Sequence, residues 1–332
     1  MKQERIILDV DTGSDDAVAI VCAMLEEEYD LLGITTVGGN CELKNTTDNT
    51  LRVVDACGGG VSVHMGSELP LASTLVPWGI QGMTLPHYEK NNVFGSFHPD
   101  RLPLPDPISK VQEPRAAVWL IETLLAQPDY SVTLIPVGPE TNIALAIRAD
   151  DRILKKIKRV VLMGGTHDVY YPTQAAEFNI WADPEAAEIL LTSGLDITMV
   201  SLDATSDVLL TEEQSQMIRA IGTVPAVFVA DMIDQRLKAS GNNAGAALHD
   251  PLALCAAAHP EVLTDVWDTS CHIDLGRGYA YGETVLGRNY MQVKGEDGML
   301  HDLPNNVHYA RKADREFFFH WLYDILSSAA NH

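Results

Sequence analysis

Four aspartates lie within eight residues near the start of this 332-residue chain, in the segment DVDTGSDD. Asp9 and Asp11 interrupt the end of the apolar run Ile6 to Val10, and Asp15 and Asp16 open the next apolar run. Carboxylates that crowd together repel one another unless a cation or a shared proton compensates their charge. Oxygen ligands gathered at one place suit a hard divalent ion such as Ca²⁺ or Mg²⁺. We therefore expect the chemistry of the protein at this segment.

The same segment is predicted to be a strand, a turn and the start of a helix. Ile6 to Val10 is typical of a short buried strand, and Gly13 suits a turn. Acidic residues are also favoured in the first turn of a helix for purely structural reasons, which would explain one or two of the acids. Capping does not explain Asp9 and Asp11, because an uncompensated charge at the end of a buried strand is unfavourable.

Further strands alternate with helices along the first two thirds of the chain. The predicted strands are Leu31 to Val37, Val61 to Met65, Val132 to Val137, Arg159 to Met163 and Ile197 to Leu202. This alternation predicts an α/β fold with a mainly parallel, doubly wound (Rossmann-like) sheet. In such sheets the ligand binds at the carboxyl ends of the strands, where the acidic segment also lies.

The chain after about residue 205 has a different pattern, mostly helical and followed by late strands and a terminal helix. We predict one domain over 1–332, with an α/β core at about 5–205 and a mainly helical and late-strand part at about 206–332. A long stretch rich in Pro and Gly, from Pro70 to Pro114, is expected to be a functional loop or a lid.

Composition excludes several classes of partner. A formal net charge of −23 argues against nucleic acid and anionic membranes. The five cysteines are scattered and odd in number, which argues against a disulfide framework and a zinc site. No apolar run approaches the ~18 residues of a membrane helix, and the first strand begins too early for a signal peptide to precede it. The expected location is the cytoplasm.

An Asp-x-Asp pair at the end of a first strand also occurs in Mg²⁺-dependent phosphotransferases of the haloacid dehalogenase type, where one aspartate is the nucleophile. That pattern has Thr or Val two places after the second aspartate, where this chain has Gly13. The pair Asp15-Asp16 is also foreign to it. An EF-hand loop does not fit, because its glycine and terminal glutamate are missing at the required spacing.

Six motifs occur in order along the chain: DVDTGSDDA, TTVGGN, GPETNIALA, VLMGG, AEFNIWADPEAA and HDPLA. Together, from residue 5 to about 260, they closely resemble the inosine-uridine-preferring nucleoside hydrolases. The resemblance implies hydrolysis of ribonucleosides to ribose and free base. It also implies a bound Ca²⁺ that chelates the ribose 2′- and 3′-hydroxyls and one water, and a homodimer or homotetramer.

At the matching positions, the resemblance implies four protein ligands for Ca²⁺: the carboxylates of Asp11, Asp16 and Asp250 and the main-chain carbonyl of Val137. These oxygens, a water and two sugar hydroxyls fit the six to eight ligands that Ca²⁺ takes. Asp11 would also be the general base that activates the Ca²⁺-bound water, because Ca²⁺ lowers the pKa of water only modestly. Cleavage would pass through an oxocarbenium-like transition state.

The resemblance also implies a set of residues around the ribose: Asp15, Asn40, Met163, Glu177 and Asn179. Asp15, Asn40, Glu177 and Asn179 would hold the sugar, and Met163 would pack beneath it. Asp9 would support the ligands from behind. Without the resemblance, Glu177 and Asn179 also fit an ordinary loop with a helix cap, and Asn40 a turn.

His249 precedes Asp250 and should lie near the leaving base. The resemblance makes it a hydrogen-bond donor or acid that neutralises the departing base, work that suits a histidine with a near-neutral pKa. The structural alternative is a histidine whose ring is satisfied by a backbone group. Its position beside a predicted metal ligand favours the functional role.

Two residues depart from the family pattern and concern substrate recognition. Trp78 stands where many relatives have a histidine, and it would either stack on the base or pack as part of the loop's core. Tyr171 stands where many relatives have an asparagine that contacts the 5′-hydroxyl. A Ca²⁺-dependent nucleoside-binding protein without turnover is the non-enzymatic alternative, but the intact Asp11 speaks against it, because binding alone needs no base.

Overall fold

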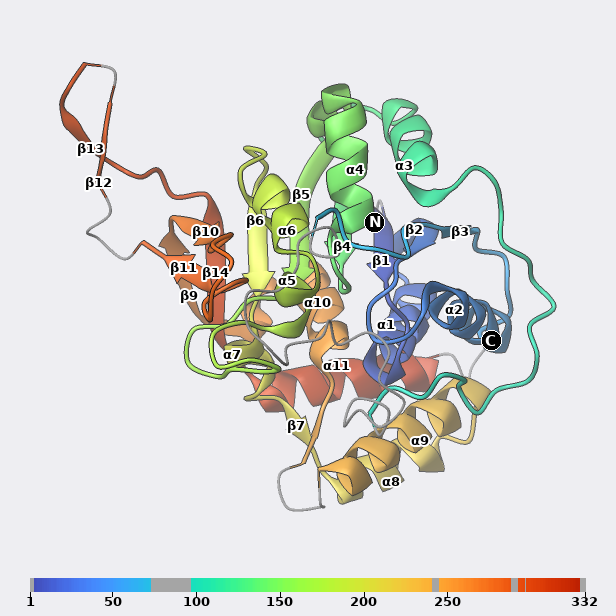
Figure 1. The fold of residues 1–332 in the computed structure, drawn as a ribbon. Helices are drawn as coiled ribbons and strands as arrows, with labels where there is room; N and C mark the ends of the chain where they lie inside the picture. The colour runs from blue at the N-terminus through green and yellow to red at the C-terminus, as the bar shows by residue number, and fades with distance from the viewer. Residues whose placement is uncertain (1–2, 73–96, 241–244, 288–291, 296, 329–332) are drawn as a thin grey trace.

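An eight-stranded sheet with the order β3-β2-β1-β4-β5-β6-β14-β9 forms the centre of the protein (Figure 1). The computed structural model describes residues 3–72, 97–240, 245–287, 292–295 and 297–328. The strands are β1 (Glu4–Val10), β2 (Tyr29–Thr36), β3 (Val63–Met65), β4 (Val132–Pro136), β5 (Ile157–Met163), β6 (Ile197–Val200), β14 (Val307–Ala313) and β9 (Leu263–Thr269). Neighbouring strands are parallel except for β14 and β9. The predicted mainly parallel sheet is confirmed.

Helices cover both faces of this sheet, because successive residues of a strand point to opposite sides. In β1, Ile6 and Leu8 belong to one apolar core, whereas Ile7 belongs to the other. The first core includes residues of α1 (Ser14–Leu25), α2 (Leu43–Ala56), α8 (Glu212–Ala220), α9 (Val224–Ala239), α10 (His249–Ala258) and α11 (Arg315–Ser328). The second includes residues of α3 (Ala116–Leu125), α4 (Thr141–Ala149) and α6 (Pro184–Leu191).

Shorter elements complete the described chain. They are α5 (Phe178–Ala182), α7 (Leu202–Thr205), the 3₁₀ helices η2 (Asp151–Lys156) and η3 (Pro260–Val262), and three two-stranded sheets: β7 (Leu209–Leu210) with β8 (Ala246–Ala247), β10 (Cys271–Ile273) with β11 (Thr284–Leu286), and β12 (Gln292–Lys294) with β13 (Leu300–Asp302). Figure 1 shows the β12–β13 hairpin extending away from the rest of the chain.

Several elements differ from the sequence-based expectation. The strand predicted to end at Leu202 ends at Val200, because Ser201 caps α7 by accepting the backbone N–H of Ala204. The mostly helical part after residue 205 is interrupted between α8 and α9, and Pro225 lies in the first turn of α9, where a missing N–H costs nothing. The edge strand β9 was not predicted. Its residues alternate between exposed and partly buried, and so it lacks the apolar run of a buried strand.

The carboxyl end of β1 is tied to its neighbours by Asp9. Its Oδ1 accepts the hydroxyl of Thr35, on β2, and the Nδ2 of Asn142, on α4, at 2.8 Å. Asn142 Nδ2 also donates to the carbonyl of Thr36 at 3.0 Å. These contacts fix the rim of the sheet at the point where β1 passes into the acidic segment. Support of the ligands by Asp9 stays a prediction.

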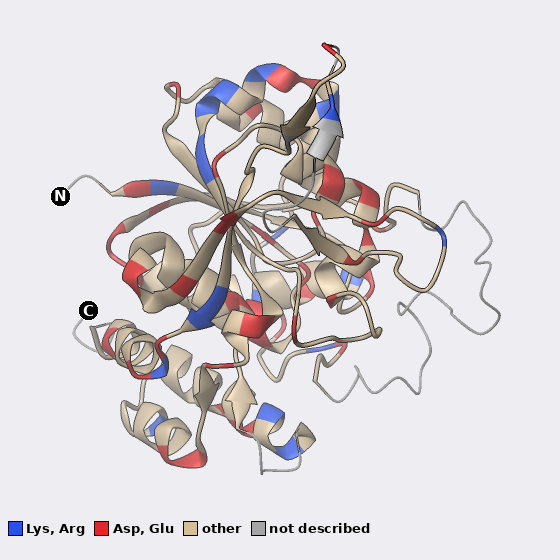
Figure 2. Cartoon of the chain, turned by 90° about the vertical axis from the view of Figure 1, so that its left-hand side faces the viewer, with Lys and Arg blue, Asp and Glu red and all other residues tan. Residues whose placement is uncertain are grey.

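Acidic residues are distributed over helices, strands and loops rather than gathered on one face (Figure 2). In the part of the chain that the structure describes, no helix is both long and apolar enough to cross a membrane. The buried acids at the end of β1 require a separate explanation.

Candidate active site

Asp11, Asp16 and Asn40 form one buried hydrogen-bond network between β1, α1 and the loop after β2. Asp16 accepts the backbone N–H of Asp11 at 3.1 Å and that of Gly13 at 2.9 Å, so it holds the turn into α1. Asn40 donates its side-chain amide to Asp11 Oδ1 at 3.2 Å and to Asp16 Oδ2 at 3.1 Å. Its backbone N–H donates to Asp11 Oδ2 at 2.6 Å. The structure therefore brings these three predicted site residues together.

Two glycines leave the space that the Asp11 carboxylate occupies. A Cβ added to Gly39 would lie 2.0 Å from Asp11 Oδ2, and one added to Gly138 would lie 2.9 Å from Asp11 Oδ1. No real side chain tolerates the first distance without a shift of the carboxylate. The Gly-Gly pair of the TTVGGN motif is therefore required by close packing, and not only by a turn.

Asp15 faces the other way, toward α9. Its Oδ2 accepts Nη2 of Arg236 at 3.1 Å, and Arg236 Nη1 donates to the hydroxyl of Ser14 at 3.0 Å. The Nδ1 of His98 lies 3.8 Å from Asp15 Oδ1, and both atoms are buried without a hydrogen-bond partner among the described residues. Arg236 and His98 were not predicted. The sequence feature that could have indicated Arg236 is its position between Ile233 and Leu237, two apolar residues that α9 buries.

A cavity of about 320 Å³ opens beside this network. Of the predicted site residues, those that line it are Asp15, Asn40, Val137, Met163, Glu177, Asn179, His249 and Asp250. The other described lining residues are Phe97, His98, Val169, Tyr171, Phe178, Leu202 and Arg236. The rim of the sheet and the helical half of the chain thus contribute to one cavity. Trp78 lies outside the described residues.

Glu177 and Asn179 line the cavity and also stabilise the local backbone through hydrogen bonds. The Glu177 carboxylate caps α5 by accepting the backbone N–H groups of Asn179 and Ile180, and it also accepts that of Gly165 at 3.1 Å. Asn179 donates its side-chain amide to the carbonyls of Val137 at 2.9 Å and Met163 at 3.1 Å. Burial raises the pKa of Glu177 to about 7. The helix-cap alternative is therefore present in the structure, and contact with a sugar stays a prediction.

His249 and Asp250 occupy the first turn of α10. The Nδ1 of His249 lies 2.8 Å from the hydroxyl of Thr205, so a side chain satisfies this nitrogen instead of the backbone group considered from the sequence. Burial, with Arg236 adding to it, lowers the pKa of His249 to about 4. A neutral imidazole at pH 7 can donate a hydrogen bond from one ring nitrogen. The near-neutral pKa expected for an acid is absent.

The buried carboxylates fit a divalent cation. Burial raises the pKa of Asp11 and of Asp250 well above the usual range, and repulsion from the neighbouring aspartates adds to it. Burial and Asp15 raise the pKa of Asp16 to about 6. For Asp15 the effect of burial is outweighed by nearby cationic groups, chiefly Arg236, which keep its pKa low. A cation would let all four ionise together.

Ligand atoms of Asp15, Asp16 and His98 lie within 4.8 Å of one another, which marks a candidate metal site on this side of the network. Hard cations prefer carboxylate oxygens to an imidazole nitrogen. The chemistry of the donors therefore favours the aspartates as the core of such a site. The ligand set Asp11, Asp16, Asp250 and Val137 stays a prediction. The Val137 carbonyl accepts one hydrogen bond from Asn179 and has a second lone pair for a cation.

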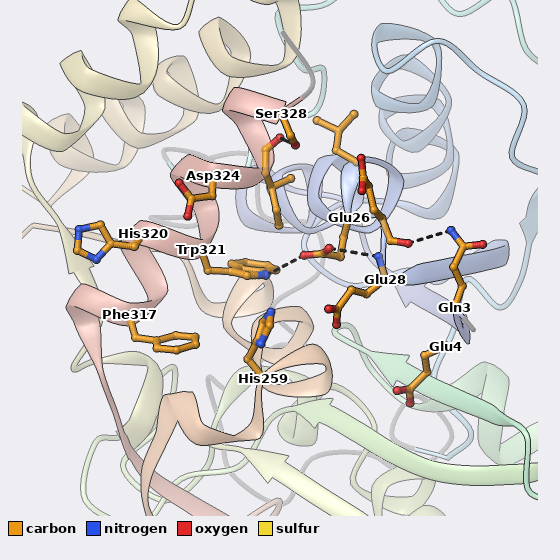
Figure 3. Close-up of a pocket in the computed structure, with 13 residues that line it drawn as sticks. Gln3, Glu4, Glu26, Glu28, His259, Phe317, His320, Trp321, Asp324 and Ser328 are labelled. Carbon is orange, nitrogen blue, oxygen red and sulfur yellow. Dashed lines mark hydrogen bonds between the residues drawn. The ribbon is translucent and has the colours of Figure 1, made fainter. Parts of the chain in front are cut away.

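A larger hollow, of about 780 Å³, lies at the opposite end of β1 and is lined by α11 and the end of α1 (Figure 3). Its side chains are aromatic and acidic. Trp321 Nε1 donates to Glu26 Oε2 at 3.0 Å, and Gln3 Nε2 donates to the carbonyl of Glu27 at 2.9 Å. None of the six sequence motifs reaches this hollow. The cavity beside Asp11 is therefore the candidate active site, although it is smaller.

Comparison with known proteins shows the family to which the chain belongs. Residues 6–320 match the family described as inosine-uridine preferring nucleoside hydrolase. The chain is 38% identical over 266 residues to the inosine-uridine preferring nucleoside hydrolase of Crithidia fasciculata, covering 79% of this chain and 81% of that protein. It is 36% identical over 290 residues to the pyrimidine-specific ribonucleoside hydrolase RihB of Escherichia coli (strain K12), covering 86% and 88%. The structure of a purine-preferring ribonucleoside hydrolase from Gardnerella vaginalis has a TM-score of 0.84 at 28% identity and covers 98% of this chain and 99% of that one.

Proposed function

This chain belongs to the inosine-uridine preferring nucleoside hydrolase family and is a nucleoside N-ribohydrolase, and on that premise we propose how its buried acids carry out the reaction. The cavity beside Asp11 binds the nucleoside, and water cleaves the N-glycosidic bond to give ribose and free base. Family membership favours this reaction over the two alternatives considered from the sequence, a phosphohydrolase and a binding protein without turnover.

Asp11, Asp16, Asp250 and the carbonyl of Val137 would hold a Ca²⁺ ion. The observation that supports this is the packing of three buried carboxylates whose pKa values are raised, which an added cation would reverse. A Ca²⁺ ion bound there would supply positive charge to the ribose hydroxyls and lower the pKa of a water molecule. The residues do the remaining work.

Asp11 is the general base. Its carboxylate accepts the proton of the attacking water while the water oxygen bonds to C1′ of the ribose. The two hydrogen bonds from Asn40 to Asp11 fix the direction of the carboxylate, and precise orientation is a large part of such catalysis.

The ribose-facing residues are Asp15, Asn40, Met163, Glu177 and Asn179, and all five line the cavity. Carboxylate and amide oxygens around the sugar stabilise the positive charge that develops as the bond to the base breaks. His249 donates a hydrogen bond to the departing base. Trp78 is proposed to stack on the base, on the strength of the sequence alone.

Calcium binding by the Asp250→Asn variant tests the ligand set. Metal-stripped wild-type protein should bind Ca²⁺ in a calorimetric titration, and the variant should bind it at least about 10-fold more weakly, because one anionic ligand is lost. Asp324→Asn makes the same chemical change at an exposed position on α11 and should leave the affinity unchanged. Equal affinities for wild type and Asp250→Asn would remove Asp250 from the site.

The match over residues 6–320 also supports the proposal that the chain forms a single hydrolase domain. We further propose that it assembles as a homodimer or homotetramer, as the family resemblance implies. Light scattering after gel filtration distinguishes these states from a monomer.

A further inference from the structure

Arg236 is the one Lys or Arg among the described residues that line the cavity beside Asp11. Its side chain comes from α9, which packs on the same side of the sheet as α1 (Figure 1). The residue is 4% exposed and carries a guanidinium cation. Burial of a charge is unfavourable unless it is paired, and Arg236 is paired with Asp15. The pair still leaves a cation at the wall of the cavity, where it can act on a substrate.

The position of the guanidinium is fixed by three neighbours. Nη1 donates to the Ser14 hydroxyl at 3.0 Å and Nη2 donates to Asp15 Oδ2 at 3.1 Å. The ring of Phe97 lies with its centroid 5.9 Å from the guanidinium carbon. The planar fork of an arginine can serve several acceptors in fixed directions at once. Arg236 is thus held rigidly at the wall of the cavity.

The cavity has two chemically different parts, if the proposed function is correct. Asn40, Glu177 and Asn179 come from the rim of the sheet and offer the polar groups that a ribose needs. The remaining wall includes Phe97, Leu202, His249 and Arg236, which come from other segments and are apolar, aromatic or basic. A nucleobase is a flat aromatic ring with polar edges, so this second part suits the base. Arg236 contacts both parts, because it bonds to the ribose-facing Asp15 and its guanidinium lies over the ring of Phe97. It therefore lies at the boundary between the sugar and the base.

The reaction places negative charge on the base, next to that boundary. When the N-glycosidic bond breaks, its electron pair stays on the base nitrogen, while the water oxygen bonds to C1′ and its proton passes to Asp11. The base then takes up one proton, so that a nucleoside and a water give ribose and a neutral base. Until that proton arrives, the departing base is an anion. A fixed cation aimed at developing negative charge lowers the barrier.

We infer that Arg236 is a leaving-group residue, which stabilises the departing base as an anion. It serves best those bases whose charge spreads to an acceptor next to the broken bond, such as O2 of a pyrimidine or N3 of a purine. This inference rests on the proposed function and adds to it a residue that no family motif contains.

The competing explanation is that Arg236 only holds Asp15 and Ser14 in place. Loss of that support would disturb the ribose, and every riboside would be affected alike. Loss of leaving-group stabilisation would affect only substrates whose leaving group is poor. Two kinds of substrate therefore separate the two roles.

The test compares uridine and inosine with 4-nitrophenyl β-D-ribofuranoside, whose nitrophenolate leaves readily without help. In Arg236→Gln we expect kcat/KM for the nucleosides to fall on the order of 10²-fold and kcat/KM for the nitrophenyl riboside to fall less than about 5-fold. Arg236→Lys keeps the positive charge but loses the planar guanidinium, so it should retain more nucleoside activity than Arg236→Gln. Arg219→Gln removes an arginine that pairs with Asp231 and Asp234 outside the cavity. It should leave kcat/KM unchanged for all three substrates.

Equal losses on all three substrates would overturn the inference and leave Arg236 as a support for Asp15. Uridine and inosine that the wild-type enzyme does not cleave would instead contradict the proposed function. If Arg236→Gln does not fold, Arg236→Lys decides the question by the same ratio of nucleoside to nitrophenyl riboside activity. A ratio equal to that of wild type, with both activities reduced, would count against the leaving-group role.

Discussion

Ribose release by the Asp11→Asn variant is expected to be on the order of 10³- to 10⁴-fold slower than by wild type. An asparagine side chain cannot take up the proton of the attacking water at neutral pH. It would also place an amide group against the two N–H donors of Asn40, which now point at the carboxylate oxygens. The measurement is kcat for inosine and uridine, by reducing-sugar assay.

Asp9→Asn is a matched control for this prediction, two residues earlier on the same strand. Asp9 bonds to Thr35 and Asn142 rather than to Asn40, so its amide variant should lose far less activity. Thermal unfolding of both variants checks that each is folded. A loss in Asp9→Asn as large as that in Asp11→Asn would contradict the assignment of the base.

Gly39→Ala is expected to reduce ribose release at least about 10²-fold, although it changes no functional group. The added Cβ would lie 2.0 Å from Asp11 Oδ2, so the carboxylate must leave its position. A displacement of about 1 Å in a catalytic group is enough for a loss of this size. The same displacement should also weaken Ca²⁺ binding in a calorimetric titration, which is a readout independent of turnover.

Gly278→Ala is the control, because no atom lies within 4 Å of the Cβ that it would add. Its ribose release and unfolding temperature should match those of wild type. If Gly39→Ala retained full activity, the close packing around Asp11 would be unimportant for the reaction. The precise direction of the Asp11 carboxylate would then be unimportant as well.

The fold could be predicted where the sequence has regular apolar runs. The runs Ile6 to Val10 and Val132 to Val137 became central parallel strands, because both of their faces are covered by helices. The edge strand β9 and the β12–β13 hairpin lack such runs, because one or both of their faces are exposed and their pattern resembles that of a loop.

The candidate site could be predicted as a set of motifs but not as a set of contacts. Asn40 and Asp11 come from two of these motifs and contact each other, because the loops after β1 and β2 meet at one rim of the sheet. The helix cap that the sequence offered as the alternative for Glu177 is present, and both carboxylate oxygens accept N–H groups of α5. Arg236 and His98 were missed, since they belong to no motif and reach the site only through the packing of α9 and the segment around Phe97.

We propose that water cleaves nucleosides in the cavity beside Asp11 with the help of a divalent cation held by the buried aspartates. The most direct test is ribose release from a panel of purine and pyrimidine nucleosides by the purified protein, before and after treatment with a chelator. We predict release of ribose that is abolished by the chelator and restored by added Ca²⁺. Ribose release that persists at full rate in the metal-stripped protein would contradict it.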